Sequence, residues 1–219
     1  MARRTKEEAL ETREQLLDAA EQVFRERGVG HASLAEVADA AGVTRGAVYH
    51  HFESKAELFQ ALMARAEMPI DTAFEDFENQ DIADPLALFR EQGLQALEHL
   101  TGNSRVQNVF EVLFLRCEYT DELAAVGEQH VSDRLDCLNK CKAVLDQAVA
   151  KGQLPPDTDT HLAAHGAFAF VTGLMRDWVQ SPASFDLKAG APQLIDMYVA
   201  GLRANPPRLA SSSKRTGND

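Results

Sequence analysis

Side chains suited to contacting DNA are concentrated in one short stretch of the chain. Arg45 can form a bidentate hydrogen bond to guanine O6 and N7, and Tyr49 can donate a hydrogen bond to a phosphate oxygen. Thr44 lies just before them, where the N-terminus of a helix presents backbone N–H groups and a positive dipole to an anion. The predicted DNA-contacting residues are Ser33, Thr44, Arg45, Gly46, Tyr49, His50, His51 and Lys55.

Two short helices separated by a glycine-containing turn are predicted to position these side chains. Ser33 and Glu36 form a capping box that opens the first helix, and Thr44 caps the second, which ends near Phe52. The second helix carries apolar residues on one side and polar residues on the other. A packed back and a polar front are typical of the recognition helix of a helix-turn-helix, which enters a major groove.

A second capping box, made by Ser54 and Glu57, opens the next helix. Lys55 lies at the start of this helix, where we expect a point charge that contacts phosphate. The helix continues almost to Pro69, which halts it. The predicted DNA-binding domain therefore spans residues 1–66.

The rest of the chain is also predicted to be helical, which makes the fold class all-α with about nine helices. Val, Ile and Thr are few, and no stretch alternates apolar and polar residues over the length of a strand. Residues 67–205 form the predicted ligand-binding and dimerisation domain, and residues 206–219 a polar, disordered tail. The remaining predicted helices cover about residues 8–27, 84–97 and beyond, 104–117, 121–151, 159–180 and 188–204, while residues 69–83 are mixed, with Phe74 and Phe77 spaced for one helical turn.

The charge of the 219-residue chain is unevenly distributed. A net charge of −12 taken alone argues against nucleic acid as a partner. Residues 1–66, however, carry a net charge of only −2, and residues 67–219 carry −10. The smaller domain carries little net charge, so it can approach the phosphate groups of DNA.

Composition and motifs exclude several other classes of protein. Three cysteines, no apolar run near the roughly 18 residues of a membrane helix and no secretory apolar segment predict a cytoplasmic location and no membrane contact. No nucleophile elbow, phosphate loop or paired His-Glu metal helix occurs, so we expect no enzyme activity. Cys137 with Cys141, and His161 with His165, each place two potential metal ligands on one helical face. Without further ligands they favour packing or a solvated face, so we expect no metal and no cofactor, while redox sensing by the cysteines stays open.

The helix-turn-helix segment resembles that of a known family. The segment SLAEVADAAGVTRGAVYHHF (residues 33–52), followed by SKAEL (54–58), is similar to the DNA-binding head of the TetR family of transcriptional repressors, over about residues 8–66. One departure is His50, where relatives often carry tryptophan. The segments MARRTKEEALETR (1–13), RCEY (116–119), GQLP (152–155) and SPASFDL (181–187) resemble the AcrR and TtgR type, the branch that represses multidrug efflux pumps.

Aromatic and soft side chains on separate helices are spaced so that they can converge in the larger domain. In the efflux repressors that the chain resembles, equivalent helices line a large apolar cavity for chemically varied drugs, and repackable walls explain such breadth. Relatives can carry polar residues where this chain has Phe110 and Phe114, which implies a drier pocket. For each aromatic residue by itself, core packing remains the favoured alternative. The predicted ligand-binding residues are Phe89, Phe110, Phe114, Cys137, Cys141, Phe168, Val171, Thr172, Met175 and Arg176, with Thr172 and Arg176 as the expected polar anchors.

The last two predicted helices suit pairing of two copies of the chain. Gly166, Ala169 and Gly173 form a strip of small residues where another backbone can approach closely. Together with Leu194 and Tyr198 they predict a four-helix homodimer interface across a two-fold axis. The alternative is that both helices only close a monomer core.

These observations predict a homodimeric, ligand-responsive transcriptional repressor that binds a palindromic operator in double-stranded DNA. The resemblance implies control of a multidrug efflux pump operon and release by a hydrophobic small molecule. One alternative is a regulator of a metabolic operon that responds to a fatty acid, an acyl-CoA or another metabolite. Two others are a helical carrier of hydrophobic ligands without DNA function and a small-molecule-modifying helical-bundle enzyme.

Overall fold

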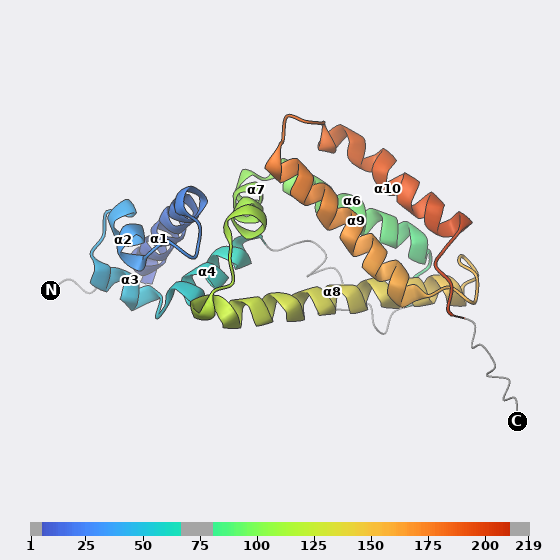
Figure 1. The fold of residues 1–219 in the computed structure, drawn as a ribbon, viewed down its shortest axis with the longest axis horizontal. Coiled ribbons are helices and arrows are strands. Elements are labelled where there is room, and N and C mark those ends of the chain that lie inside the picture. The colour runs from blue at the N-terminus through green and yellow to red at the C-terminus, as the bar shows by residue number, and fades with distance from the viewer. Residues whose placement is uncertain (1–5, 67–80, 211–219) are drawn as a thin grey trace, which may run out of the picture.

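The fold is all-α, as the sequence predicts (Figure 1). The computed structural model describes residues 6–66 and 81–210, and these residues contain nine α-helices and one isolated β-bridge. Short turns of other helix types join some of them: the 3₁₀ turns η1 (Ala64–Ala66) and η4 (Asp121–Leu123) and the π-helical turn η3 (Val112–Arg116). The α-helices are α1 (Lys6–Arg27), α2 (Leu34–Ala40), α3 (Arg45–His51), α4 (Lys55–Met63), α6 (Pro85–Gly102), α7 (Ser104–Glu111), α8 (Ala124–Ala150), α9 (Thr160–Gln180) and α10 (Leu187–Ala204).

Helices α1 to α4 form a small head at one end of the elongated molecule (Figure 1). Helix α1 packs against α2 and α4, and α2 packs against α3. The rings of Phe24 and Phe59 meet edge to face, with centroids 5.9 Å apart, and both side chains are fully buried. This geometry is the favoured one for an aromatic pair, and it anchors α4 beneath α1.

The two predicted capping boxes differ in the structure. Ser33 and Glu36 form a complete box, in which each side chain bonds the other residue's backbone N–H. Ser54 accepts a hydrogen bond from the backbone N–H of Glu57 at 3.1 Å, but the Glu57 carboxylate accepts from the N–H of Glu53 instead of Ser54. The second box is therefore only half formed, although its helix begins where the sequence predicts.

The body is built around α8, which runs along one side of it from the head to the far end (Figure 1). Helix α6 packs against α8, α9 and α10, and α9 packs against α8 and α10. Buried side chains of the head and body, such as Leu17 of α1, Leu97 of α6 and Val109 of α7, belong to one continuous apolar cluster. The head is therefore packed onto the body, and a change in the packing of the body can move it.

Three details of the chain differ from the sequence predictions or cannot be compared with them. The helix predicted over 104–117 ends as an α-helix at Glu111 and continues as the π-helical turn η3. Residues 206–210 are not a disordered tail, because the N–H of Leu209 donates to the Asp157 carbonyl at 2.9 Å and that of Asp159 to the Pro207 carbonyl at 2.8 Å. The expected helical turn at Phe74 and Phe77 lies outside the described residues.

In the part of the chain that is described, the helices are too short or too polar to cross a bilayer.

Candidate functional site

Helix α3 is held in the head by its apolar back. Thr44 caps it by accepting a hydrogen bond from the backbone N–H of Ala47 at 3.3 Å. Val48 is fully buried, and Phe52, just after the helix, is 1% exposed. Because these residues bury one side of α3 in the apolar cluster of the head, the opposite side faces solvent.

The exposed front of α3 carries the polar side chains that the sequence predicts there. Arg45, Gly46, Tyr49 and His50 are exposed, and His51 is half-buried. The guanidinium of Arg45 lies 5.7 Å from the centre of the Tyr49 ring, and its Nη2 donates to the Tyr49 hydroxyl at 3.4 Å. This contact between residues one helical turn apart holds the guanidinium at the front of α3.

Lys55 differs from its predicted position. Its side chain is only 5% exposed, and its Nζ donates to the carbonyls of Gly30 at 3.2 Å and Ala32 at 3.0 Å. A third bond, at 2.8 Å, reaches the carboxylate of Glu122 in η4. All three donors of the ammonium are thus occupied within the protein, so we withdraw Lys55 as a phosphate contact. Its acceptors are distant in sequence, which is why the sequence alone suggests an exposed charge.

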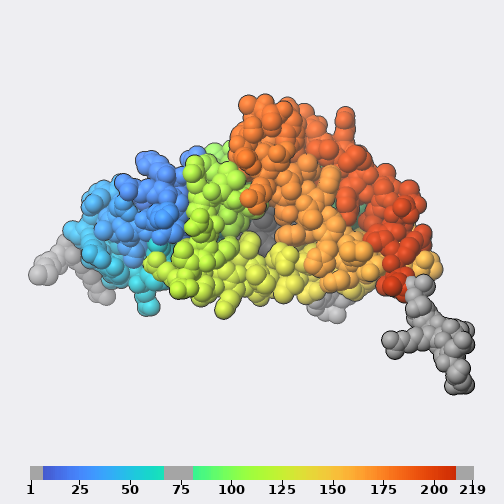
Figure 2. All heavy atoms as spheres, viewed as in Figure 1, coloured from blue at the N-terminus to red at the C-terminus, as the bar shows by residue number. Residues whose placement is uncertain are grey.

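A cavity of about 1000 Å³ lies in the body, walled by α4 and α6 to α10. This volume is at the upper end of the range for small-molecule sites. The molecular surface is hollowed on the face where α7, α8 and α9 meet (Figure 2). All ten residues predicted to bind ligand line this one cavity, although ligand binding itself stays a prediction. They are Phe89, Phe110, Phe114, Cys137, Cys141, Phe168, Val171, Thr172, Met175 and Arg176.

The two predicted polar anchors are less available than expected. The Thr172 hydroxyl donates to the Phe168 carbonyl at 2.7 Å, so its proton is used within α9 and only its lone pairs remain for a ligand. Arg176 lines the cavity with an exposed side chain, which keeps its charge in contact with water. The other polar groups on the cavity wall are therefore also candidates for contacting a ligand.

One such group, Gln92, was not predicted from the sequence. It lies on the side of α6 that lines the cavity, together with Phe89, Gly93 and Ala96. These four positions have the i, i+3, i+4, i+7 spacing of one helical face. A glutamine in the middle of an otherwise apolar stripe is the signal that could have identified it from the sequence.

Burial shifts the pKa values of several titratable side chains on the cavity wall, among them Tyr119, whose pKa is raised. Burial and the nearby Glu118 raise the pKa of the Cys117 thiol to about 11, so this thiol is a poor nucleophile at neutral pH. Burial raises the pKa of Tyr198 to about 12. Burial also lowers the pKa of His130, whose ring stacks on Tyr119 with centroids 6.2 Å apart. These groups are therefore uncharged at neutral pH, and the charged side chains that line the cavity are Asp133, Arg134 and Arg176.

The residues of the predicted dimer interface divide into two groups. Gly166, Ala169 and Gly173 are exposed on one side of α9. Leu194 and Tyr198 are half-buried, and the Tyr198 hydroxyl donates to the Ala163 carbonyl at 3.1 Å within the same chain. The strip is open at Gly173, where a Cβ would meet nothing within 4 Å, but a Cβ at Gly166 would lie 2.9 Å from the Tyr198 hydroxyl of the same chain. Tyr198 itself packs within its own body and lines the cavity.

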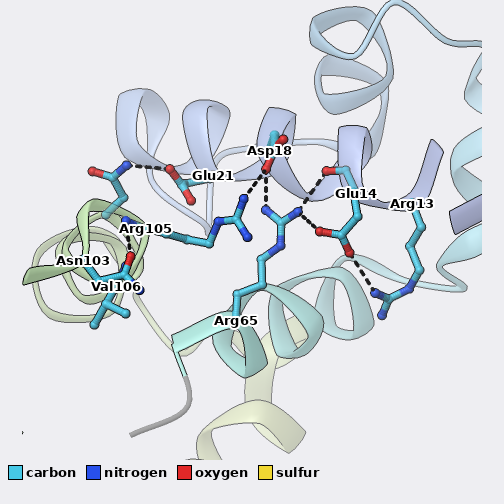
Figure 3. A network of polar contacts seen from close by, with 9 residues as sticks. Arg13, Glu14, Asp18, Glu21, Arg65, Asn103, Arg105 and Val106 are labelled. Carbon is cyan, nitrogen blue, oxygen red and sulfur yellow. Dashed lines mark hydrogen bonds and ion pairs between the residues drawn. The ribbon is translucent and has the colours of Figure 1, made fainter. Parts of the chain in front are cut away.

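Three polar pairs join successive turns of α1 in the head to α7 in the body, and Figure 3 shows the pair of Asp18 and Arg105. Arg65 of η1 adds to this network, because its guanidinium, in a side chain only 8% exposed, binds the carboxylates of Glu14 and Asp18. Helix α7 is therefore fixed to the head along its length. The three pairs are Asp18 with Arg105 at 3.9 Å, Glu21 with Asn108 at 2.7 Å and Arg25 with Glu111 at 2.8 Å.

The segment formed by α7 and η3 lies between the head and the cavity. On one side, Phe110 and Phe114 line the cavity with ring centroids 5.2 Å apart. On the other, the carbonyl of Arg116 accepts a hydrogen bond from the N–H of Val29 in the head at 2.9 Å. Gly28, with φ +82°, is close enough that a Cβ there would lie 3.3 Å from the same carbonyl. A shift of this segment would move the head.

Neither predicted two-residue pair gains further metal ligands. The rings of His161 and His165 meet edge to face at 4.6 Å, and Cys137 and Cys141 line the cavity. Among the described residues, no group of three His, Cys, Asp or Glu side chains is arranged to hold a metal ion.

Comparison with known proteins identifies the family. Residues 16–62 match the family described as bacterial regulatory proteins, tetR family, and residues 84–204 match the MAATS-type transcriptional repressor, C-terminal region. The chain is 42% identical to the HTH-type transcriptional regulator TtgR of Pseudomonas putida, over 94% of this chain and 98% of that protein. The chain belongs to the TetR family. The resemblance inferred from the sequence is thereby confirmed.

Solved structures of other TetR-family repressors share the fold. The crystal structure of NalD, the secondary repressor of the MexAB-OprM multidrug efflux pump in Pseudomonas aeruginosa, aligns with a TM-score of 0.81 and 32% identity, over 90% of this chain and 98% of that one. SmeT in a complex with triclosan aligns with a TM-score of 0.74 and 30% identity, over 87% and 90% of the two chains.

Proposed function

We propose that this TetR-family chain is a homodimeric repressor of a multidrug efflux operon, released from its operator by a hydrophobic small molecule. Support for the target comes from relatives whose names describe efflux repressors and which align over almost the whole chain. The exposed front of α3 supports operator binding and argues against a carrier without DNA function.

One observation carries the ligand response: the α7–η3 segment contacts the cavity on one side and the head on the other. A ligand between Phe110 and Phe114 can favour one position of this segment. That position is transmitted through the Arg25–Glu111 ion pair and the Val29–Arg116 hydrogen bond. The ligand acts only through its different affinity for the two positions, as any population shift requires.

Two heads must be paired to contact successive major grooves of a palindromic site. We assign this pairing to α9 and α10, where Leu162 is 55% and Met197 is 59% exposed beside the small residues of α9. Exposed large apolar side chains next to a strip of small residues suit a close helix-to-helix contact. In this proposal Tyr198 supports the interface from within one chain.

The test is an electrophoretic mobility shift with the DNA immediately upstream of the protein's own gene. We expect binding in the absence of ligand and release by hydrophobic compounds that bind the cavity. Glu111→Gln should keep operator binding but weaken ligand-induced release, because it removes the charge that holds Arg25. Glu128→Gln, on the exposed side of α8, is the matched control and should behave as the unmodified protein. Equal release from both variants would refute the proposed route.

A further inference from the structure

Two cysteine side chains lie next to each other on the cavity wall. Cys137 and Cys141 are one turn apart on α8, so they share one face of the helix, and both line the cavity. Cys137 is half-buried, Cys141 is 9% exposed, and neither is part of a disulfide. A hydrogen bond from the Cys137 thiol lowers the pKa of Cys141. The two sulfur atoms are therefore within hydrogen-bonding distance of each other.

The surroundings of the pair are mainly apolar. Cys141 belongs to a buried cluster with Leu138 and Leu145 of α8, and Phe168 of α9 packs against this cluster and lines the cavity. The charged residues of α8 on the cavity wall are Asp133 and Arg134, which lie about one turn before Cys137 and are exposed, so their charges stay in contact with water. A reagent that reaches the two thiols through the cavity therefore meets apolar side chains around them.

The geometry of the helix limits what the two thiols can form. Residues one turn apart on a helix have Cβ atoms about 5–6 Å apart, whereas a disulfide needs Cβ atoms about 3.5–4.5 Å apart. A direct disulfide would therefore distort α8 at this point. A single atom bonded to both sulfur atoms supplies the missing length, because a bond from a thiolate to zinc is about 2.3 Å long and one to arsenic is similar. The pair is thus better placed to hold a bridging atom than to be oxidised.

The number of ligands decides which bridging atom fits. A structural zinc ion takes four protein ligands, and nowhere in residues 6–66 and 81–210 are even three His, Cys, Asp or Glu side chains arranged around a common point. A linear two-coordinate ion such as Hg(II) holds its two sulfur atoms further apart than hydrogen-bonded thiols. Trivalent arsenic with one organic substituent is pyramidal and needs only two sulfur ligands, which it holds close together.

From this geometry we propose that Cys137 and Cys141 are a capture site for monosubstituted trivalent arsenicals, bound covalently through both sulfur atoms. An arsonous acid, RAs(OH)₂, loses both hydroxyl groups as water, each with the proton of one thiol, and two As–S bonds replace two As–O bonds. Arsenic stays trivalent, so the step needs no oxidant or reductant. The organic group R extends into the cavity. Capture goes beyond the proposed function, because it requires neither the operator nor a second copy of the chain.

The test combines phenylarsine oxide, which hydrates to the arsonous acid, with intact-mass spectrometry of the full chain. We expect one adduct per chain, heavier than the protein by one molecule of phenylarsine oxide less one molecule of water. Because the second As–S bond forms within the same helix, the adduct should resist the monothiol glutathione, whereas 1,2-ethanedithiol should remove it. Cys137→Ser and Cys141→Ala should each lose half of any adduct at about a hundredfold lower glutathione concentration.

Further variants separate capture from a change in structure. Cys117→Ser removes the remaining thiol, whose pKa is raised by burial, and should keep the glutathione-resistant adduct. If circular dichroism shows that Cys141→Ala is unfolded, Cys141→Ser takes its place. Because the intact helix holds the two thiols together, the arsenical should raise the melting temperature of the unmodified chain and of Cys117→Ser, but not that of Cys137→Ser.

Three results would each overturn the assignment: no adduct, an adduct that depends on Cys117, or an adduct that glutathione removes as readily from the unmodified chain as from the variants at 137 and 141. Operator binding is measured on the same samples before the arsenical is added. If the resistant adduct forms and the operator is not bound, the repressor function fails and the capture site stands. If the operator is bound and the adduct is absent, the reverse holds.

Discussion

Replacing Lys55 by methionine tests whether this residue holds the head together or contacts DNA. Methionine keeps the apolar stem but leaves the carbonyls of Gly30 and Ala32 without their donor. Leaving a buried acceptor without its charged donor lowers the free energy of unfolding by about 1–3 kcal/mol. The hydrogen bond to Gly30 is only partly buried, so its loss contributes less. Glu122 is 56% exposed and returns to water at a cost of about 0–1 kcal/mol.

The expected loss of stability is therefore about 2–4 kcal/mol, which for a chain of this size lowers the melting temperature by about 5–15 °C. The assay is thermal unfolding followed by circular dichroism, combined with operator binding over a range of salt concentrations. Removing a phosphate contact would lower the slope of log affinity against log salt by about 1. We expect the slope to stay unchanged at temperatures where the variant is folded. An unchanged melting temperature with a reduced salt slope would refute the structural role of Lys55.

Four further changes give distinct expected outcomes. Arg45→Ala should weaken specific operator binding by about 1–3 kcal/mol and relax base preference without lowering the melting temperature, because the side chain is exposed; unchanged sequence preference would remove it from base contact. Phe114→Ala should alter the ligand response measured by titration but preserve ligand-free operator binding, whereas unfolding would show that the ring is core. Gly173→Leu should yield monomers by light scattering, since a Cβ at 173 meets nothing within 4 Å in its own chain, and a variant that stays dimeric would contradict the interface. Burial lowers the pKa of His130, so the unfolded chain binds its proton first and stability falls as the pH drops below about 6.5; His130→Gln should reduce this loss in urea unfolding between pH 7.5 and 5, and an unchanged pH profile would exclude the effect.

Local signals explain why the head could be predicted closely. Thr44 caps α3 through a bond to a residue three positions later, and the apolar back of the helix follows from spacing alone. Such contacts form between residues that are close together in the sequence, so the sequence alone predicts them. The same holds for the start of α6, where Asp84 caps the helix and Pro85 occupies its first turn.

Features that depend on contacts between residues distant in the sequence could not be predicted from it. The acceptors of Lys55 lie 23 and 25 residues before it and on Glu122, so no local pattern distinguishes this buried lysine from an exposed one. The ordered residues after Pro206 depend on the loop that precedes α9, which becomes a neighbour only in the folded chain.

The cavity contains both residues that the sequence predicts and residues that it does not. Its aromatic and soft walls follow from helical faces whose residue types favour a common apolar space, so Phe110 and Phe168 could be placed there. Gln92 was missed because an amide on a helix is usually solvated, and the packing of α6 against its neighbours buries it; its place in an apolar stripe of α6 is the only local signal. The π-helical turn η3 also has no signal in the sequence, because a single turn of five residues is too short to show an apolar spacing of its own.

The most direct test of the account is the fluorescence anisotropy of a labelled duplex from the protein's own upstream region, titrated with protein in the presence and absence of triclosan, the compound in the SmeT complex. We expect tight, salt-dependent binding that Arg45→Ala weakens and that triclosan reverses at concentrations where it occupies the cavity. No binding at low salt, or binding that is unaffected while triclosan demonstrably fills the cavity, would contradict the claim that the cavity is coupled to α3.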